Sequence, residues 1–168
     1  MSSIVRATSP VVGDPPPGTW SNCLVVDGVA YVAGMTARGS GQSGTVGDEY
    51  AQAKEIFGKI RHLVEAAGGS MADVVKVTIF VTDITQREKV WQARREFFTG
   101  NFPTSTLVQV AALADPSLKV EINAVAHIGA SKRRSGGEYG ALAKIDAPLS
   151  RRSRLWRWGV GEKSCRSS

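Results

Sequence analysis

The side chains best suited to chemistry alternate along a short segment near residue 120. Even-numbered spacing would place four of them on one face of a strand: Lys119, Glu121, Asn123 and His127. A carboxylate beside an amide could hold a water molecule, and a histidine could act as a general base. The same spacing also fits a face that is solvated or packed against another subunit. Both interpretations stay open for Asn123, whereas Lys119 and His127 better suit the solvated face.

Tryptophan and hydroxyl residues supply a second set of candidates. Trp20 follows a Pro/Gly-rich segment and joins no apolar stripe, so it could line a pocket or pack in the core. Trp91 lies beside a helical stripe, which favours packing in the core or at an interface. Ser105 and Thr106 are ordinary strand residues unless a ligand forms hydrogen bonds with them.

The sequence lacks the motifs that mark several common kinds of site. There is no P-loop, Rossmann glycine pattern, HExxH or CxxC motif, so neither a metal nor another cofactor is predicted. Cys23 and Cys165 are too few for a disulfide framework or a zinc site. Cys23 falls in a predicted strand without a neighbouring His-Asp pair, which favours a buried small side chain over a nucleophile.

Hydrophobic periodicity predicts the elements that must position these residues. Asp27-Gly28 lies between two β-rich runs, which is typical of a type I′ hairpin over residues 24–32. Apolar residues three and four apart predict a helix over residues 48–67, with Gly68-Gly69 after it. Thr85 and Glu88 resemble a capping box for a second helix, which is expected to run to about residue 99.

Alternating apolar residues predict the remaining strands, at residues 75–81, 106–110 and 118–128. Residues 34–47 are Gly/Ser-rich and are expected to form a loop, and the Pro-rich opening should be extended. The resulting order, β-β-α-β-α-β-β, predicts an α+β architecture with two helices on one face of a mixed sheet. The long crossovers around the helices imply that some strand pairs are parallel.

Charge is distributed unevenly along the 168 residues. Residues 1–128 hold 11 Lys/Arg against 12 Asp/Glu, whereas residues 129–168 hold 10 against 3. We therefore expect a nearly neutral domain over 1–128 and a basic, disordered tail over 129–168. The tail combines arginines with Trp156 and Trp158, a composition that could bind RNA or only be solvated. No long apolar run or signal sequence is evident, so a cytoplasmic location and no membrane partner are expected.

Five collinear segments resemble the Rid family (also known as YjgF/YER057c/UK114). They are GTWSNCLVVDGVAYVAG, DVVKVTIFVTDIT, a helix that ends in EFF, FPTSTLVQV and KVEINAVA, over roughly residues 15–128. The resemblance implies a chorismate-mutase-like fold and a homotrimer with clefts between subunits. It also implies hydrolysis of enamines or imines, such as 2-aminoacrylate, to 2-keto acids and ammonia.

Beside this resemblance, the sequence departs from typical members of the Rid family at several positions. Ser105 stands where an arginine usually clamps a carboxylate, and Asn123 stands at the position of the second acid of the usual IEIEA motif. Leu107 replaces a pocket cysteine, Trp91 an asparagine, and Trp20 a tyrosine. Because these changes remove charge and add aromatic surface, they predict a pocket for a neutral, flat ligand.

We therefore predict a Rid-like small-molecule enzyme, an imine or enamine deaminase-type hydrolase, without a cofactor. Asn123 and Ser105 are the expected catalytic residues. The expected substrate-binding residues are Trp20, Gly34, Leu107, Thr106 and Trp91. Two alternatives stay open, a non-catalytic metabolite-binding trimer and an RNA-binding protein that uses the basic tail.

Overall fold

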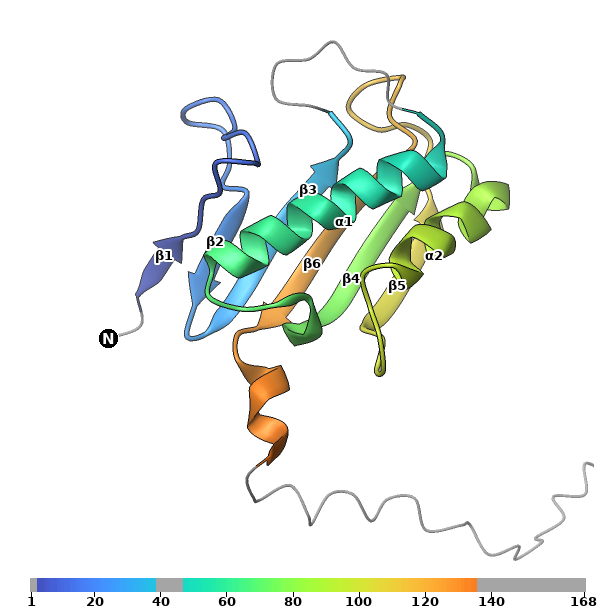
Figure 1. Cartoon of the computed structure of the whole chain (residues 1–168). Coiled ribbons are helices and arrows are strands. Elements are labelled where there is room, and N and C mark those ends of the chain that lie inside the picture. The colour runs from blue at the N-terminus through green and yellow to red at the C-terminus, as the bar shows by residue number, and fades with distance from the viewer. Residues whose placement is uncertain (1–2, 39–46, 136–168) are drawn as a thin grey trace, which may run out of the picture. The chain divides into compact units, whose positions relative to one another are not determined.

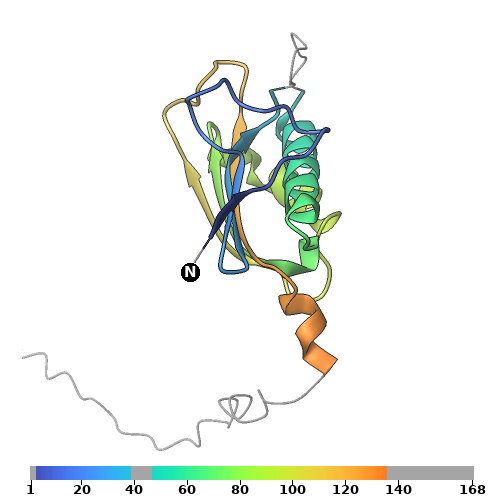
Figure 2. The ribbon, with the colours of Figure 1, turned by 90° about the vertical axis from the view of Figure 1, so that its left-hand side faces the viewer.

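The computed structural model describes residues 3–38 and 47–135, with backbone only for 133–135. One mixed sheet of six strands carries the fold, with the order β1-β2-β3-β6-β4-β5 (Figure 1). The strands are β1 (Ile4–Arg6), β2 (Cys23–Val26), β3 (Val29–Thr36), β4 (Val74–Val81), β5 (Thr104–Gln109) and β6 (Val120–His127). Two α-helices, α1 (Glu49–Ala66) and α2 (Arg87–Arg95), pack on one side of this sheet (Figure 2). The predicted α+β architecture is confirmed.

The last strand occupies the middle of the sheet. β6 pairs antiparallel with both β3 and β4, and only the β4–β5 pair is parallel. The β2–β3 hairpin turns at Asp27 and Gly28, whose φ values are 49° and 77°. Positive φ at both positions is the type I′ geometry that the Asp-Gly pair predicts.

Helix α1 supplies the largest part of the core. Its N-cap Asp48 accepts a hydrogen bond from the Ala51 N–H at 3.0 Å, and its apolar stripe faces the sheet. Phe57 is fully buried, with ring centroids 5.6 Å from Phe97 and 5.7 Å from Phe98. The core stripe of α1 comprises Ala53, Ile56, Phe57, Ile60, Leu63 and Val64. Burial of this stripe against β3 and β6 fixes the helix on the sheet.

Gln52 is a fully buried polar residue in α1. Its Oε1 accepts hydrogen bonds from the backbone N–H groups of Lys119 and Val120, at 2.8 and 3.3 Å. Its Nε2 donates to the carbonyl oxygens of Gly47 and Ser117, at 3.3 and 3.2 Å. One side chain therefore joins the start of α1 to the start of β6.

The second helix differs from its prediction. The predicted capping box of Thr85 and Glu88 was wrong, because the N-cap of α2 is Gln86, which forms no side-chain cap hydrogen bond, and Asp83 caps the turn before the helix. The Asp83 carboxylate accepts from the Thr85 N–H at 2.9 Å and the Thr85 hydroxyl at 2.6 Å, and a short 3₁₀ turn (η2, Ile84–Gln86) precedes α2. The helix also ends at Arg95, earlier than the predicted residue 99.

Regular structure continues past the predicted domain boundary at residue 128. A 3₁₀ segment (η3, Ala130–Ser135) follows β6, and the buried Asp73 accepts the Ser131 N–H at 2.7 Å. Burial alone would raise the pKa of Asp73, but hydrogen bonds from Ser131 and Ser70 outweigh burial and lower it. The rest of the predicted basic tail, 136–168, lies outside the described residues. Within the described residues, no helix is long and apolar enough to cross a membrane.

Candidate active site

The face of the sheet opposite the helices carries most of the polar candidates. Directly paired residues of neighbouring strands share a face, so the strand register places side chains in rows across the sheet. One row joins Thr36, Glu121 and Phe80. The next row joins Asn123, Thr78 and Thr106. We call this surface the open face. It brings a carboxyl group, an amide and three hydroxyls onto one surface.

Glu121 is half-buried on the open face and lies against Gly34 of β3. A Cβ atom added to Gly34 would collide with the Glu121 Oε1, so the carboxyl group occupies the space that a side chain would need. Burial raises the pKa of the Glu121 carboxyl. A carboxyl group with a raised pKa releases its proton less readily, and a positioned carboxyl group of this kind can serve as a general acid–base.

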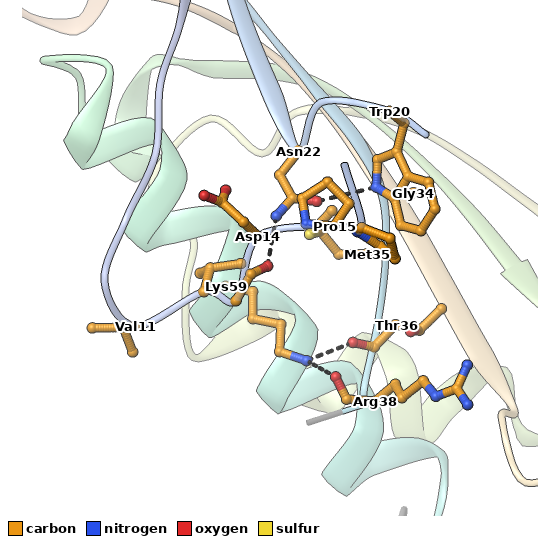
Figure 3. Close-up of a pocket in the computed structure, with 13 residues that line it drawn as sticks. Val11, Asp14, Pro15, Trp20, Asn22, Gly34, Met35, Thr36, Arg38 and Lys59 are labelled. Carbon is orange, nitrogen blue, oxygen red and sulfur yellow. Dashed lines mark hydrogen bonds between the residues drawn. The ribbon is translucent and has the colours of Figure 1, made fainter. Parts of the chain in front are cut away.

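Gly34 also lines a pocket of about 290 Å³, which β3 shares with α1 and the segment before β2 (Figure 3). Trp20 lies at its edge and is 56% exposed. The Trp20 indole N–H donates to Asn22 Oδ1 at 3.2 Å, and Asn22 Nδ2 donates to the Gly13 carbonyl oxygen at 2.9 Å. Asn22 therefore fixes the indole relative to the N-terminal segment and leaves the ring available for stacking on a ligand.

Lys59 reaches the same pocket from α1. Its Nζ donates to the carbonyl oxygens of Thr36 and Arg38, both at 2.8 Å, and pairs with Glu55 Oε1 at 2.8 Å. An ammonium group has three N–H donors, so these three contacts occupy all of them. Lys59 thus holds the end of β3 in place and has no donor left for a ligand.

The structure brings together only some of the predicted site residues. Trp20 and Gly34 line the pocket, and Asn123 and Thr106 lie in one row on the open face. Ser105 and Leu107 pair with Val77 and Ile79, whose buried side chains point towards the helices. Within the chain, Ser105 and Leu107 therefore face away from Asn123.

Trp91 lies in the helix layer, on the other side of the sheet from the open face. It is half-buried in α2, and the Arg87 guanidinium lies 5.8 Å from its ring centroid. Within the chain, this position fits the packing interpretation rather than contact with the pocket. In the described part of the chain, no three His, Cys, Asp or Glu side chains lie close enough to hold a metal ion.

Replacement of Gly34 by alanine tests the contact with Glu121. The added Cβ must displace the Glu121 carboxyl group, which is the end of a flexible side chain. We expect activity to fall by about tenfold or more, because misplaced catalytic groups lose rate steeply, with little change in melting temperature. Gly58→Ala is the matched control, since its Cβ meets no atom within 4 Å. Equal activity of Gly34→Ala and wild type would contradict a role for this contact.

Comparison with known proteins decides the family. The model of the family described as Endoribonuclease L-PSP matches residues 13–128. The chain belongs to this family. Its members among solved structures include proteins described as Rid and YjgF/YER057c/UK114 proteins, so the predicted Rid resemblance is confirmed.

Three solved structures illustrate the relationship. A protein of unknown function from Pseudomonas aeruginosa is 38% identical, with a TM-score of 0.70 over 76% of this chain and 94% of that chain. RidA from an Antarctic Psychrobacter species is 27% identical, with a TM-score of 0.64 over 74% and 99%. A YjgF/YER057c/UK114 family member from Mycobacterium tuberculosis is 28% identical, with a TM-score of 0.62 over 75% and 100%.

Proposed function

We propose that this family member hydrolyses the C=N bond of a small imine, which it receives directly or forms from an enamine. The observation that carries the proposal is the half-buried Glu121 carboxyl group against Gly34, with a raised pKa and Asn123 in the next row. Sequence reasoning assigned the water-handling role to Asn123, which cannot accept a proton. Glu121, on the same face, can accept one.

The chemistry needs one group that exchanges protons and one that holds water. A protonated Glu121 gives its proton to the β-carbon of an enamine, which becomes an iminium ion. The resulting carboxylate then takes a proton from a water molecule held by the Asn123 amide, and the oxygen bonds to the imine carbon. Glu121 transfers that proton to nitrogen, and the C–N bond then breaks as the new hydroxyl group returns its proton to the Glu121 carboxylate. Ammonia leaves, and a carbonyl product remains.

The open face also supports assembly into a homotrimer. It carries apolar side chains that a lone subunit leaves accessible, including Tyr31 at 51% and Val108 at 40% exposure. Burial of this face between subunits would shield Glu121 further from water. In such a trimer, Ser105 and Trp91 could reach a cleft only from the edge of a neighbouring subunit. Their predicted catalytic and substrate-binding roles would then apply to the cleft of that neighbour. Sedimentation equilibrium of the purified chain measures the subunit number.

Imine hydrolysis by the purified protein tests the function. An amino-acid oxidase generates 2-imino acids in the presence of semicarbazide, and an amine oxidase generates imines without a carboxylate. We expect the wild type to lower semicarbazone formation from at least one class. The enzymatic proposal fails if neither class of imine is hydrolysed. If a keto acid or imine analogue then still raises the melting temperature, the chain is a non-catalytic binding protein.

A further inference from the structure

Phe80 is the large apolar side chain that the strand register places beside Glu121. The two residues are directly paired across β4 and β6, and Thr36 is paired with Glu121 from β3. Directly paired residues of antiparallel strands have Cβ atoms about 4.5–5.5 Å apart on one face. Phe80 is half-buried although both α-helices lie on the other side of the sheet (Figure 2). Its ring is therefore covered in part by its neighbours in the row, which include Glu121 and Val108.

The Glu121 carboxyl group is turned away from this ring. Its Oε1 lies in the space that a Cβ atom on Gly34 would occupy. Because Thr36 is the direct partner of Glu121, Gly34 is its diagonal neighbour on β3. The Glu121 side chain thus has the Phe80 ring on the β4 side and a glycine without a side chain on the β3 side. The β3 side is the one from which water or a ligand can approach the carboxyl group.

Charged groups are distant from Glu121 on the open face. Apart from Glu121, the side chains of its own row and the next row are uncharged: Thr36, Phe80, Val108, Asn123, Thr78 and Thr106. Lys119 precedes Glu121 on the chain, but its Nζ lies 3.7 Å from the Glu49 carboxylate. Other charged groups of this side are Arg38 beyond the end of β3, Lys76 two rows away and His127 three rows away. Among the described residues, burial is accordingly what raises the pKa of Glu121.

We propose that Phe80 is a positioning residue for Glu121, whose ring keeps the carboxyl group against Gly34 and shields it from water on the β4 side. Phe80 is the largest apolar side chain among the neighbours of Glu121, and an aromatic ring excludes more water than a threonine or an asparagine can. The ring takes no part in proton transfer and acts only through Glu121. The effect on rate rests on the proposed imine hydrolysis, whereas the effect on the carboxyl group does not.

Phe80→Thr tests the proposal, because it removes the ring and keeps a β-branched side chain that suits a strand. We expect this variant to lower the pKa of Glu121, since water regains access to the carboxylate. Carbon-13 NMR of the glutamate carboxyl groups measures the titration, with Glu121→Gln to assign the signal. We also expect kcat/KM for imine hydrolysis to fall by about tenfold or more, because the carboxyl group loses its fixed position.

Two further variants of Phe80 separate shielding from folding. Phe80→Leu keeps an apolar cover and should retain most of the wild-type titration and rate. Phe80→Val replaces Phe80→Thr if the threonine variant does not fold, and a smaller downward shift of the pKa of Glu121 is then expected. Val75→Ala is the matched control, because Val75 is a 40% exposed apolar residue of β4 that is not paired with Glu121.

Three results would overturn the assignment: an unchanged titration of Glu121 in Phe80→Thr, a shift of the same size in Val75→Ala, or wild-type kcat/KM in Phe80→Thr. A rate loss without a change in titration would mean that the ring serves only the fold. Turnover separates this proposal from the proposed function. If Phe80→Thr lowers the pKa but the wild type hydrolyses no imine, the shielding by Phe80 stands and the enzymatic function fails. If imines are hydrolysed and Phe80→Thr equals the wild type in rate and titration, the function stands and the role of Phe80 fails.

Discussion

Glu121→Gln is expected to reduce imine hydrolysis by about 100-fold or more, since proton transfer by a positioned side chain contributes about 10²–10⁴ in rate. The amide keeps the size of the side chain beside Gly34 but cannot take a proton from water. Steady-state rates with the semicarbazide assay measure the loss. Glu88→Gln is the matched control, because Glu88 is exposed and pairs with Arg95. Activity of Glu121→Gln near that of the control would exclude Glu121 as the catalytic carboxyl group.

Glu121→Gln lowers the expected rate of hydrolysis, but it should raise the free energy of unfolding relative to wild type as the pH increases. Because burial raises the pKa of Glu121 in the folded state, folding favours the protonated side chain. Any stabilisation from that proton is present below the unfolded-state pKa and is lost as the pH rises through the higher folded-state pKa. Glu121→Gln should therefore gain stability relative to wild type as the pH increases through this window. Urea unfolding at a series of pH values measures the difference, and a constant difference would contradict the raised pKa.

Gln52→Ala should lower the free energy of unfolding by about 3 kcal/mol or more, since each buried group left without a partner costs about 1–3 kcal/mol. The truncation removes four hydrogen bonds at once and leaves a cavity in a fully buried site. The groups that lose their partner include the N–H groups of Lys119 and Val120, immediately before Glu121. Activity measured on the folded fraction should also fall, because this pair fixes the start of β6.

Urea denaturation of Gln52→Ala measures this loss in the free energy of unfolding, with Gln92→Ala as the matched control. Gln92 is exposed on α2, so its replacement should change stability by only a few tenths of a kcal/mol, as is typical of surface positions. A loss below about 1 kcal/mol for Gln52→Ala would mean that water replaces the side chain, because buried water can satisfy such groups.

The central elements of the fold could be predicted because local chemistry and periodicity agree there. The Asp27-Gly28 pair favours a type I′ turn, and the apolar stripe of α1 needs a sheet to cover it. β1 was expected only as extended chain, because its three residues are all exposed and show no alternation in burial. The cap of α2 was misassigned because Thr85 lies within the 3₁₀ turn η2, which Asp83 caps, whereas the N-cap of α2 is Gln86, which forms no side-chain cap hydrogen bond.

The site could be predicted only where it depends on the local chain. Trp20 and Gly34 were predicted as site residues because each lies within a recognisable segment, and both line the pocket. The choice between Glu121 and Asn123 depends on which faces Gly34 across two strands, and that register is not visible in one sequence. The predicted loop over residues 34–47 begins too early, because β3 continues to Thr36.

The central position of β6 has a consequence for how the chain acquires its structure. β3 and β4 have no pairing with each other and meet only through β6, the last strand of the described residues to be synthesised. Until Val120–His127 has emerged from the ribosome, the hairpin of β2 and β3 and the parallel pair of β4 and β5 are separate fragments with unsatisfied edges. A nascent chain stalled before residue 120 should therefore depend on chaperones, and insertion of the final strand would be the committed step of folding.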